Sequence, residues 1–134
     1  MAQRATGTFD VKLTPQPADD YADGVITGRL TIDKVFRGGI AGTSKGQMLT
    51  GMTAVKGSAG YVAIERVTGT VDERRGTFIL QHSGTMHAGA QQLALTVVPD
   101  SGTDELLGLS GSMTLDIANG VHAYTFTYTL PDAD

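Results

Sequence analysis

Hydrophobic and polar residues alternate along most of this chain. A period of two places successive side chains on opposite faces of a β-strand. The alternation predicts eight strands, at residues 4–14, 27–37, 40–52, 58–71, 75–87, 90–98, 110–118 and 121–130. Most of the connections are short, which is typical of antiparallel strands in an all-β fold.

Two connections are longer than the others. The first predicts a solvated acidic loop over residues 15–26, with Pro15, Pro17, Asp19, Asp20 and Asp23. The second predicts one short helical turn within residues 101–107, capped by Ser101 or Thr103. It also carries three leucines that would form an apolar plug at one end of the fold: Leu106, Leu107 and Leu109.

Turn residues predict how neighbouring strands pair. Asn119-Gly120 favours a two-residue turn that sets Leu115 opposite Tyr124 and Met113 opposite Phe126. A three-residue turn at Gly38-Gly39-Ile40 gives the pairs Leu30/Met48, Ile32/Gly46, Lys34/Ser44 and Phe36/Gly42. A turn at Ala88-Gly89 gives His82/Leu95 and Leu80/Val97. The turn within Val71–Gly76 gives Glu65/His82, Val67/Leu80, Gly69/Phe78 and Ala63/Gly84.

Glycine is frequent, with 18 among 134 residues, about twice its usual share. In three of the expected pairs an aromatic residue lies opposite a glycine: Phe36/Gly42, Gly69/Phe78 and Gly111/Tyr128. A ring can cover a strand glycine while the missing Cβ lets the sheet bend. Repeated bends favour a closed barrel, which has no edge strands.

The sequence therefore predicts one domain over residues 1–134, an eight-stranded antiparallel β-barrel. Its interior would hold side chains or one small ligand. The inner face is expected to contain Phe9, Val11, Leu13, Leu30, Ile32, Phe36, Val67, Phe78, Leu80, Leu93, Leu95, Val97, Met113, Leu115, Ile117, Tyr124 and Phe126.

Charge and composition exclude several functional classes. The net charge of −4 comes with scattered basic residues, which argues against nucleic-acid binding. No apolar run approaches the ~20 residues of a membrane span, and no signal-peptide core is present, so a cytoplasmic protein is expected. The chain has no cysteine and no cofactor motif. A metal site would need His82, His122 and Glu65 to converge, so no metal and no cofactor are expected.

Three stretches resemble a known family. They are Tyr61–Gly69, Gly76–Thr85 and Val98–Gly111, followed by His122-Ala123-Tyr124. Nearly the whole chain resembles a family of small bacterial proteins described only as a domain of unknown function. The resemblance implies a calycin-like barrel similar to allene oxide cyclase and dirigent-like barrels, with no established reaction. Matching positions are Glu65, Arg66, Gln81, His82, Gly84 and Tyr124, and Val67 stands where the family usually has an aromatic residue.

Glu65 and His82 are the sharpest candidates for chemistry, because they lie opposite each other on an otherwise apolar face. A carboxylate beside an imidazole can act as a general acid–base pair, with Tyr124 as a phenolic donor. The same pair can also be a buried polar contact that only fixes the register. If the strands turn the other way, Val62, Ile64, Thr77 and Ile79 point inward and Arg66 and Gln81 form the buried pair.

Lys34 is expected on the inner face near a barrel end. There a lysine more often reaches outward to water than acts as a nucleophile or base.

Two functional hypotheses follow from these candidates. The first is a cofactor-independent isomerase, cyclase or lyase that uses Glu65, His82 and Tyr124. The second is a non-catalytic ligand carrier or interaction barrel. Either would bind a small apolar or amphipathic molecule through Tyr61, Val67, Phe78, Leu80, Leu95, Met113, Leu115, Phe126, Tyr128 and Lys34. An outer apolar patch of Val62, Ile64 and Ile79 would suit a homodimer.

Overall fold

The computed structural model describes residues 2–17, 21–22 and 25–131. Its strands are β1 (Gln3–Gln16), β2 (Tyr21–Ala22), β3 (Val25–Gly38), β4 (Ile40–Met52), β5 (Ala59–Val71), β6 (Arg74–His87), β7 (Ala90–Val97), β8 (Ser110–Ala118) and β9 (Val121–Thr129). A 3-10 turn, η1 (Asp104–Leu106), precedes β8. The eight long strands agree with the predicted segments, because alternation marks strands well.

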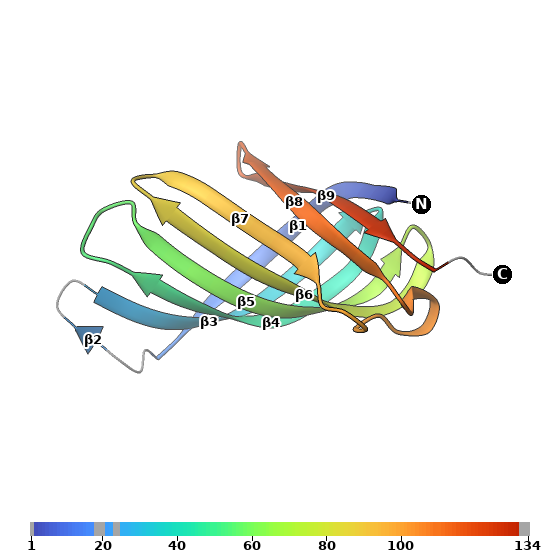
Figure 1. The fold of residues 1–134 in the computed structure, drawn as a ribbon, viewed down its shortest axis with the longest axis horizontal. Helices are drawn as coiled ribbons and strands as arrows, with labels where there is room; N and C mark the ends of the chain where they lie inside the picture. Colours follow the sequence, from blue (N-terminus) through green and yellow to red (C-terminus); the bar gives the residue numbers. More distant parts are fainter. Residues whose placement is uncertain (1, 18–20, 23–24, 132–134) are drawn as a thin grey trace.

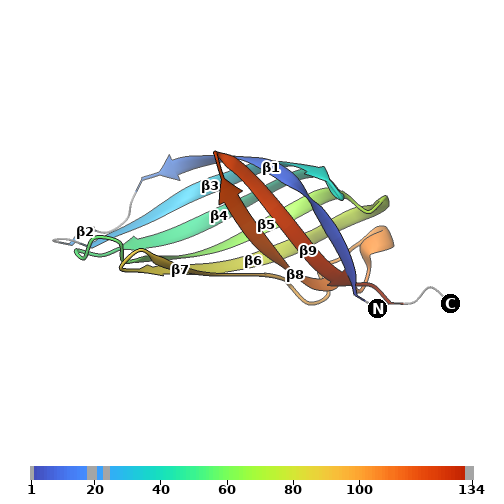
Figure 2. The same ribbon diagram turned by 90° about the horizontal axis from the view of Figure 1, so that it is seen from above.

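The long strands form a closed antiparallel barrel (Figures 1 and 2). Each strand pairs with the next along the chain from β3 to β9, and β1 closes the ring between β9 and β3. The short strand β2 is added outside this ring, beside β3. The predicted barrel is therefore confirmed. Within the described residues, no helix is long and apolar enough to cross a membrane.

The region expected to be a loop over residues 15–26 is partly strand. β1 continues to Gln16, β2 occupies Tyr21–Ala22, and β3 begins at Val25. Alternation was masked here by proline and aspartate, which the sequence analysis took as loop residues. The acidic positions Asp19, Asp20 and Asp23 lie outside the described residues.

Three of the four predicted hairpin registers are confirmed, namely those of β3–β4, β6–β7 and β8–β9. The register of β5–β6 is wrong by two residues, because its turn lies one residue earlier than expected. Asp72 and Glu73 both adopt positive φ, 46° and 74°, so they form a two-residue turn without glycine. Glu65 consequently lies opposite Leu80, not His82. A shift of two residues preserves the faces, so both side chains still point inward.

Two of the three predicted glycine–aromatic pairs are present, Phe36/Gly42 and Gly111/Tyr128. The third pair is wrong for the same reason as the register. Gly69 lies between Gly42 and Gly76, and Phe78 faces Val67 instead. A Cβ at Gly69 would lie 2.2 Å from the Ala41 carbonyl oxygen, so the backbones of β4 and β5 approach closely there. Glycine at these positions permits the bend that closes the barrel.

The core fills one end of the barrel. Rings of Phe78, Phe126 and Tyr128 stack there, with centroid separations of 5.7 and 5.3 Å. Leu106 and Leu109 are buried against this cluster, as predicted for the plug. Leu107, by contrast, is exposed, because the chain turns outward after η1.

Neither predicted cap binds the end of η1. Thr103 Oγ1 accepts a hydrogen bond from the amide of Thr77, and Ser101 Oγ accepts one from the amide of Ile79. These two side chains therefore continue the hydrogen bonding of β6 beyond the end of β7. The segment after β7 covers an edge that would otherwise be unpaired.

The other end of the barrel is open. β7 and β8 pair at two positions, Leu95/Met113 and Thr96/Ser112, and then diverge (Figures 1 and 2). Leu93 and Ile117, predicted inside, lie on these two strands beyond their pairing and are exposed by 45% and 61%. Leu13, also predicted inside, lies beyond the last pair of β1 with β9, Phe9/His122, and is 43% exposed. Each lies two or four residues from a buried residue of its own strand, namely Leu95, Met113 and Phe9, so it belongs to the inner row. The term "open end" below means the part of the barrel lined by Leu13, Leu93 and Ile117.

Candidate functional site

A buried ion pair crosses the inside of the barrel. The ammonium nitrogen of Lys34, on β3, lies 2.9 Å from Glu65 Oε2 and donates a 3.2 Å hydrogen bond to Glu65 Oε1, on β5. Lys34 is 6% exposed and Glu65 is 0% exposed. The expectation that Lys34 reaches outward to water is therefore wrong. A carboxylate in reach binds its ammonium inside the barrel instead.

The strand between these residues makes the contact possible. On the inner row of β4, Ser44 lies beside Lys34 and Gly46 lies beside Glu65. A Cβ at Gly46 would lie 2.7 Å from the Glu65 Cβ. Because these two inner-row residues of β4 are small, the Lys34 side chain can extend across the strand to the Glu65 carboxylate.

His82 joins the ion pair from β6. Its Nε2 lies 3.5 Å from Glu65 Oε2, and the residue is 4% exposed. The two side chains are diagonal neighbours, since Glu65 pairs with Leu80 and His82 with Ala63. At this distance the contact is electrostatic rather than a well-formed hydrogen bond. The sequence prediction that Glu65 and His82 meet inside is thus confirmed, although by a different pairing.

Lys34, Ser44, Glu65 and His82 are called the polar cluster below. Two of its buried atoms, Ser44 Oγ and His82 Nε2, have no hydrogen-bond partner among the described residues, and Glu65 Oε2 has none besides its 2.9 Å ion pair with Lys34. Buried polar atoms without partners are uncommon in folded proteins, because each loses its bonds to water. The cluster therefore has hydrogen-bonding capacity that the fold itself does not use.

Aromatic rings surround the polar cluster. The Lys34 ammonium lies 4.7 Å from the ring centroid of Phe9 and 5.7 Å from that of Phe36, within the range of cation–π attraction. The ring of Tyr61 meets that of His82 edge-on, with centroids 6.4 Å apart. Tyr61 also lies opposite Gly84, an aromatic–glycine pair that the incorrect register concealed.

The electrostatic environment keeps Glu65 ionised. Burial by itself raises the pKa of its carboxyl group, but the adjacent His82 and Lys34 together lower it more. The pKa of Glu65 therefore lies below its ordinary value. Burial, with a contribution from the Glu65 charge, raises the pKa of Tyr61, so that phenol stays protonated. Glu65 is thus a carboxylate, and Tyr61, next to His82, is an intact phenol.

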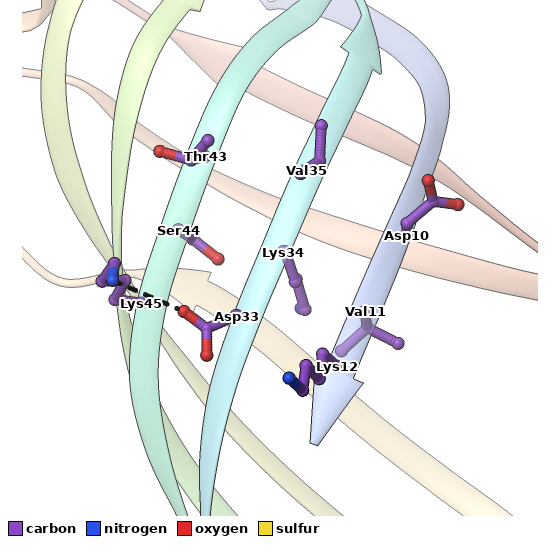
Figure 3. A pocket seen from close by; sticks show the side chains of 9 residues that line it. All are labelled: Asp10, Val11, Lys12, Asp33, Lys34, Val35, Thr43, Ser44 and Lys45. Atoms are coloured by element: carbon purple, nitrogen blue, oxygen red, sulfur yellow. Dashed lines mark ion pairs between the residues drawn. The ribbon is translucent and has the colours of Figure 1, made fainter. Parts of the chain in front are cut away.

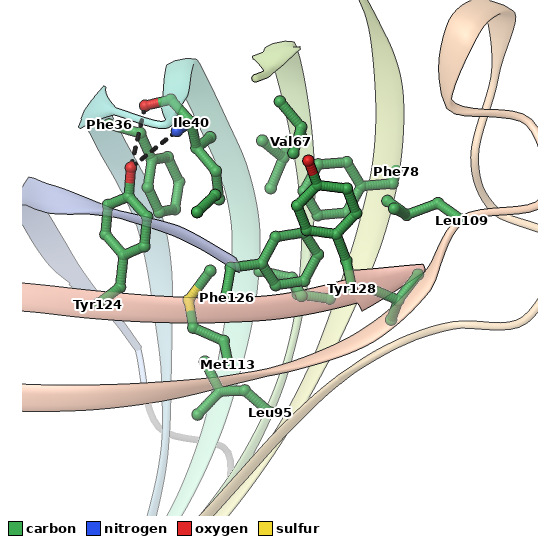
Figure 4. Close-up of a cluster of buried hydrophobic side chains, with 14 of the residues drawn as sticks. Phe36, Ile40, Val67, Phe78, Leu95, Leu109, Met113, Tyr124, Phe126 and Tyr128 are labelled. Atoms are coloured by element: carbon green, nitrogen blue, oxygen red, sulfur yellow. Dashed lines mark hydrogen bonds between the residues drawn. The ribbon is translucent and has the colours of Figure 1, made fainter. Parts of the chain in front are cut away.

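The two tyrosines of β9 use their hydroxyl groups elsewhere. Tyr124 accepts a hydrogen bond from the amide of Ile40 at 2.9 Å (Figure 4). It donates one to the carbonyl of Arg37 at 2.8 Å. Tyr128 donates to Asp72, and burial followed by this bond raises the pKa of Tyr128 to about 12. The Tyr124 hydroxyl group therefore binds the β3–β4 turn, and the Tyr128 hydroxyl group binds the β5–β6 turn.

The structure divides the predicted substrate-binding residues into two groups. One group belongs to the buried core, part of which is shown in Figure 4: Val67, Phe78, Leu80, Leu95, Met113, Phe126 and Tyr128. Lys34 and Tyr61 lie at the polar cluster, and Leu115 is partly buried against the core. The alternative orientation of the strands is wrong, because Val62, Ile64, Arg66 and Gln81 are exposed.

His122 packs apart from His82, with its ring 5.2 Å from that of Phe9. In the described part of the chain, no group of three or more histidine, cysteine or acidic residues is placed to hold a metal ion.

A separate hollow of about 330 Å³ lies over β1, β3 and β4 (Figure 3). Two ion pairs lie along it: Asp33 is 3.7 Å from Lys45, and Asp10 is 2.7 Å from Arg37. Such exposed pairs are solvated and contribute little. Lys34 and Ser44 of the polar cluster are among the lining residues, but the Lys34 ammonium binds Glu65 inside the barrel. The unused hydrogen-bonding capacity is thus in the polar cluster.

Lys34 lies on the inner face opposite Ser44, as predicted, but the sequence did not connect either residue with Glu65. The missing step was the register of β4 with β5, whose six-residue connection over 53–58 contains no turn of fixed length. Gly46 was a usable signal, because a glycine on the inner row leaves space beside Glu65.

Comparison with known proteins places the chain in a family. A family model described as "Protein of unknown function (DUF3224)" matches residues 5–128. A crystal structure of a protein of unknown function from the DUF3224 family of Shewanella oneidensis MR-1 is 50% identical, with a TM-score of 0.94. That match covers 99% of this chain and 100% of the other. No curated protein matches. This chain, with its eight-stranded barrel, therefore belongs to the DUF3224 family.

Proposed function

We propose that the protein binds a small apolar or amphipathic molecule in the open end of its barrel. The observation that carries this proposal is the exposure of inner-row apolar side chains, Leu13, Leu93 and Ile117. Removing such surface from water favours association with an apolar ligand. The short pairing of β7 with β8 supports the proposal, because it leaves the inner row accessible at this end.

A neutral fluorescent probe, N-phenyl-1-naphthylamine, tests this function by its change in emission on binding. We expect saturable binding to the wild-type protein. Leu93→Glu should weaken it by about tenfold or more, since a lost leucine contact and a nearby carboxylate both disfavour an apolar ligand.

Ile64→Glu is the matched control for this experiment. Ile64 is 49% exposed, close to the 45% of Leu93, but it lies on the outer row of β5. Its substitution should leave probe binding unchanged. Absence of saturable binding, or equal loss in both variants, would contradict the proposal.

A second candidate function is cofactor-independent acid–base catalysis in the same barrel. The observation that favours it is the His82 imidazole 3.5 Å from an ionised Glu65. In this arrangement His82 moves the proton and Glu65 stabilises the imidazolium, as in other carboxylate–imidazole pairs. Isomerisation or cyclisation of a carbonyl compound is a reaction class that such a pair can serve. Tyr124 takes no part, because its hydroxyl is bound to backbone.

Exchange of α-protons in 2-decanone, followed by proton NMR in D₂O, tests the catalytic candidate. Wild-type protein should accelerate the exchange, and His82→Gln should remove the acceleration while N-phenyl-1-naphthylamine still binds. Binding of the probe without faster α-proton exchange would identify the protein as a carrier. If neither occurs, the polar cluster is a structural feature of the barrel.

A further inference from the structure

Resting on the proposed binding function, we propose that the polar cluster receives a hydroxyl group, so that the ligands are apolar alcohols or phenols rather than carboxylic acids.

The unpartnered atoms match a hydroxyl group. Glu65 Oε2 can only accept a hydrogen bond while Glu65 is ionised, and beside its 2.9 Å contact with the Lys34 ammonium it has a second lone pair for one. Ser44 Oγ and His82 Nε2 can each donate or accept, depending on rotation and tautomer. A hydroxyl group donates one bond and accepts others, so it can bind Glu65 and one of these neighbours together. An ether or a carboxylate has no proton to donate to Glu65.

The charges of the cluster also disfavour an anion. The Lys34 ammonium and the Glu65 carboxylate cancel each other's charge at a separation of 2.9 Å. The rings of Phe9 and Phe36 cover the ammonium further. A carboxylate ligand would therefore add an uncompensated charge in a buried place, next to a like charge. A neutral ligand adds none.

A continuous row of side chains joins the open end to the cluster. Leu93 and Tyr61 both lie over Gly84: a Cβ added there would lie 3.2 Å from Leu93 Cδ1 and 2.4 Å from Tyr61 Cε1. The Tyr61 ring in turn contacts the His82 ring. Since Leu93 is exposed and Tyr61 partly exposed, an alkyl chain lying on Leu93 directs its terminal group past Tyr61 toward His82 and Glu65.

Three probes of equal chain length test the inference: 1-decanol, its methyl ether and decanoate, each displacing N-phenyl-1-naphthylamine at neutral pH. We expect decanol to bind at least about tenfold more tightly than the other two, because a hydrogen bond to a charged acceptor contributes a factor of this order. In the double variant Lys34→Met/Glu65→Leu the advantage of decanol over its ether should disappear. In Glu65→Gln, which leaves the Lys34 charge, decanoate should gain affinity.

The exposed ion pair supplies the matched control. Asp10→Asn/Arg37→Met removes a comparable pair, with a 2.7 Å contact, outside the barrel and should keep the preference for decanol. Equal binding of decanol and its ether, or tightest binding of decanoate, would overturn the hydroxyl inference while leaving the binding function in place. Failure of all three probes and of N-phenyl-1-naphthylamine to bind would instead remove the proposed function itself.

Discussion

Replacing Lys34 by methionine tests how strongly the fold depends on its buried ion pair. The substitution keeps a long apolar side chain over Phe9 and removes the charge that lies 2.9 Å from Glu65 Oε2. It leaves Glu65, at 0% exposure, either ionised with only His82 beside it or protonated against its environment. Both outcomes lower the free energy of unfolding.

The expected magnitude follows from the burial of the pair. Removing one partner of a buried ion pair costs about 3–5 kcal/mol, because the other charge stays uncompensated. Replacing both partners by apolar residues is often neutral, since no charge is then left without water. We therefore expect Lys34→Met to be strongly destabilising and Lys34→Met/Glu65→Leu to recover most of the loss. Domains of this kind have a total stability of about 5–15 kcal/mol, so the single variant is readily measured.

Urea unfolding followed by circular dichroism at pH 7 gives the free energies. Arg37→Met is the control, because its 2.7 Å contact with Asp10 is solvent-exposed. That variant should unfold with no measurable change. Two results would refute the reasoning: a Lys34→Met variant as stable as the control, or a double variant as unstable as Lys34→Met alone.

Three further predictions concern other parts of the molecule. The pKa of Glu65 is lowered on folding, so the stability that its ionised form contributes is complete above the ordinary value of 4.5 and is lost as pH falls through the folded value. The stability difference between wild type and Glu65→Gln should therefore shrink in urea unfolding below pH 4.5. Gly69→Ala, with its Cβ placed 2.2 Å from a backbone oxygen, should destabilise by at least about 2 kcal/mol. Gly51→Ala meets open space and should unfold like wild type in the same assay. Tyr124→Phe leaves the buried amide of Ile40 without its acceptor and should lower stability by about 1–3 kcal/mol, while the preference for decanol in probe displacement stays the same.

The effect of glycine substitution depends on details that the sequence does not contain. Gly89 has φ of 86° and open space around it, so substitution there acts through turn geometry, as the sequence suggests. Gly102 looks similar in sequence, yet a Cβ there would lie 1.9 Å from the Leu106 carbonyl oxygen. Gly102 therefore permits its backbone to lie close to that of Leu106, where the chain folds back on itself around η1.

Strand positions and faces could be predicted because alternation is a local property of the chain. Registers could be predicted where the turn type is evident, as at Asn119-Gly120, where a positive φ is confirmed for both residues. The turn at Asp72-Glu73 also has positive φ at both residues but contains no glycine, so its position was placed one residue late. A turn placed one residue late shifts the strand register by two residues. Glu65 was therefore paired with His82 instead of Leu80.

The open end was beyond prediction for a different reason. The position of β8 relative to β7 depends on a long connection, residues 98–109, that has no turn of fixed length. Leu93 and Ile117 were expected inside because their alternation is regular, and the alternation is correct. Alternation does not indicate over how many residues β8 pairs with β7.

The glycine content of the chain bears on the site as well as on the fold. On the inner row of β4, Gly42 lets the backbones of β4 and β5 approach, because a Cβ there would lie 2.1 Å from the Thr68 carbonyl oxygen. Two positions later on the same row is Ser44, and Gly46 follows. Because Ser44 and Gly46 are small, they leave space on the inner face of β4. Lys34 on β3 can therefore reach across it to Glu65 on β5. A larger residue at either position would fill this path and separate the two charges. The closure of the barrel and the assembly of the polar cluster thus depend on the same property of one strand.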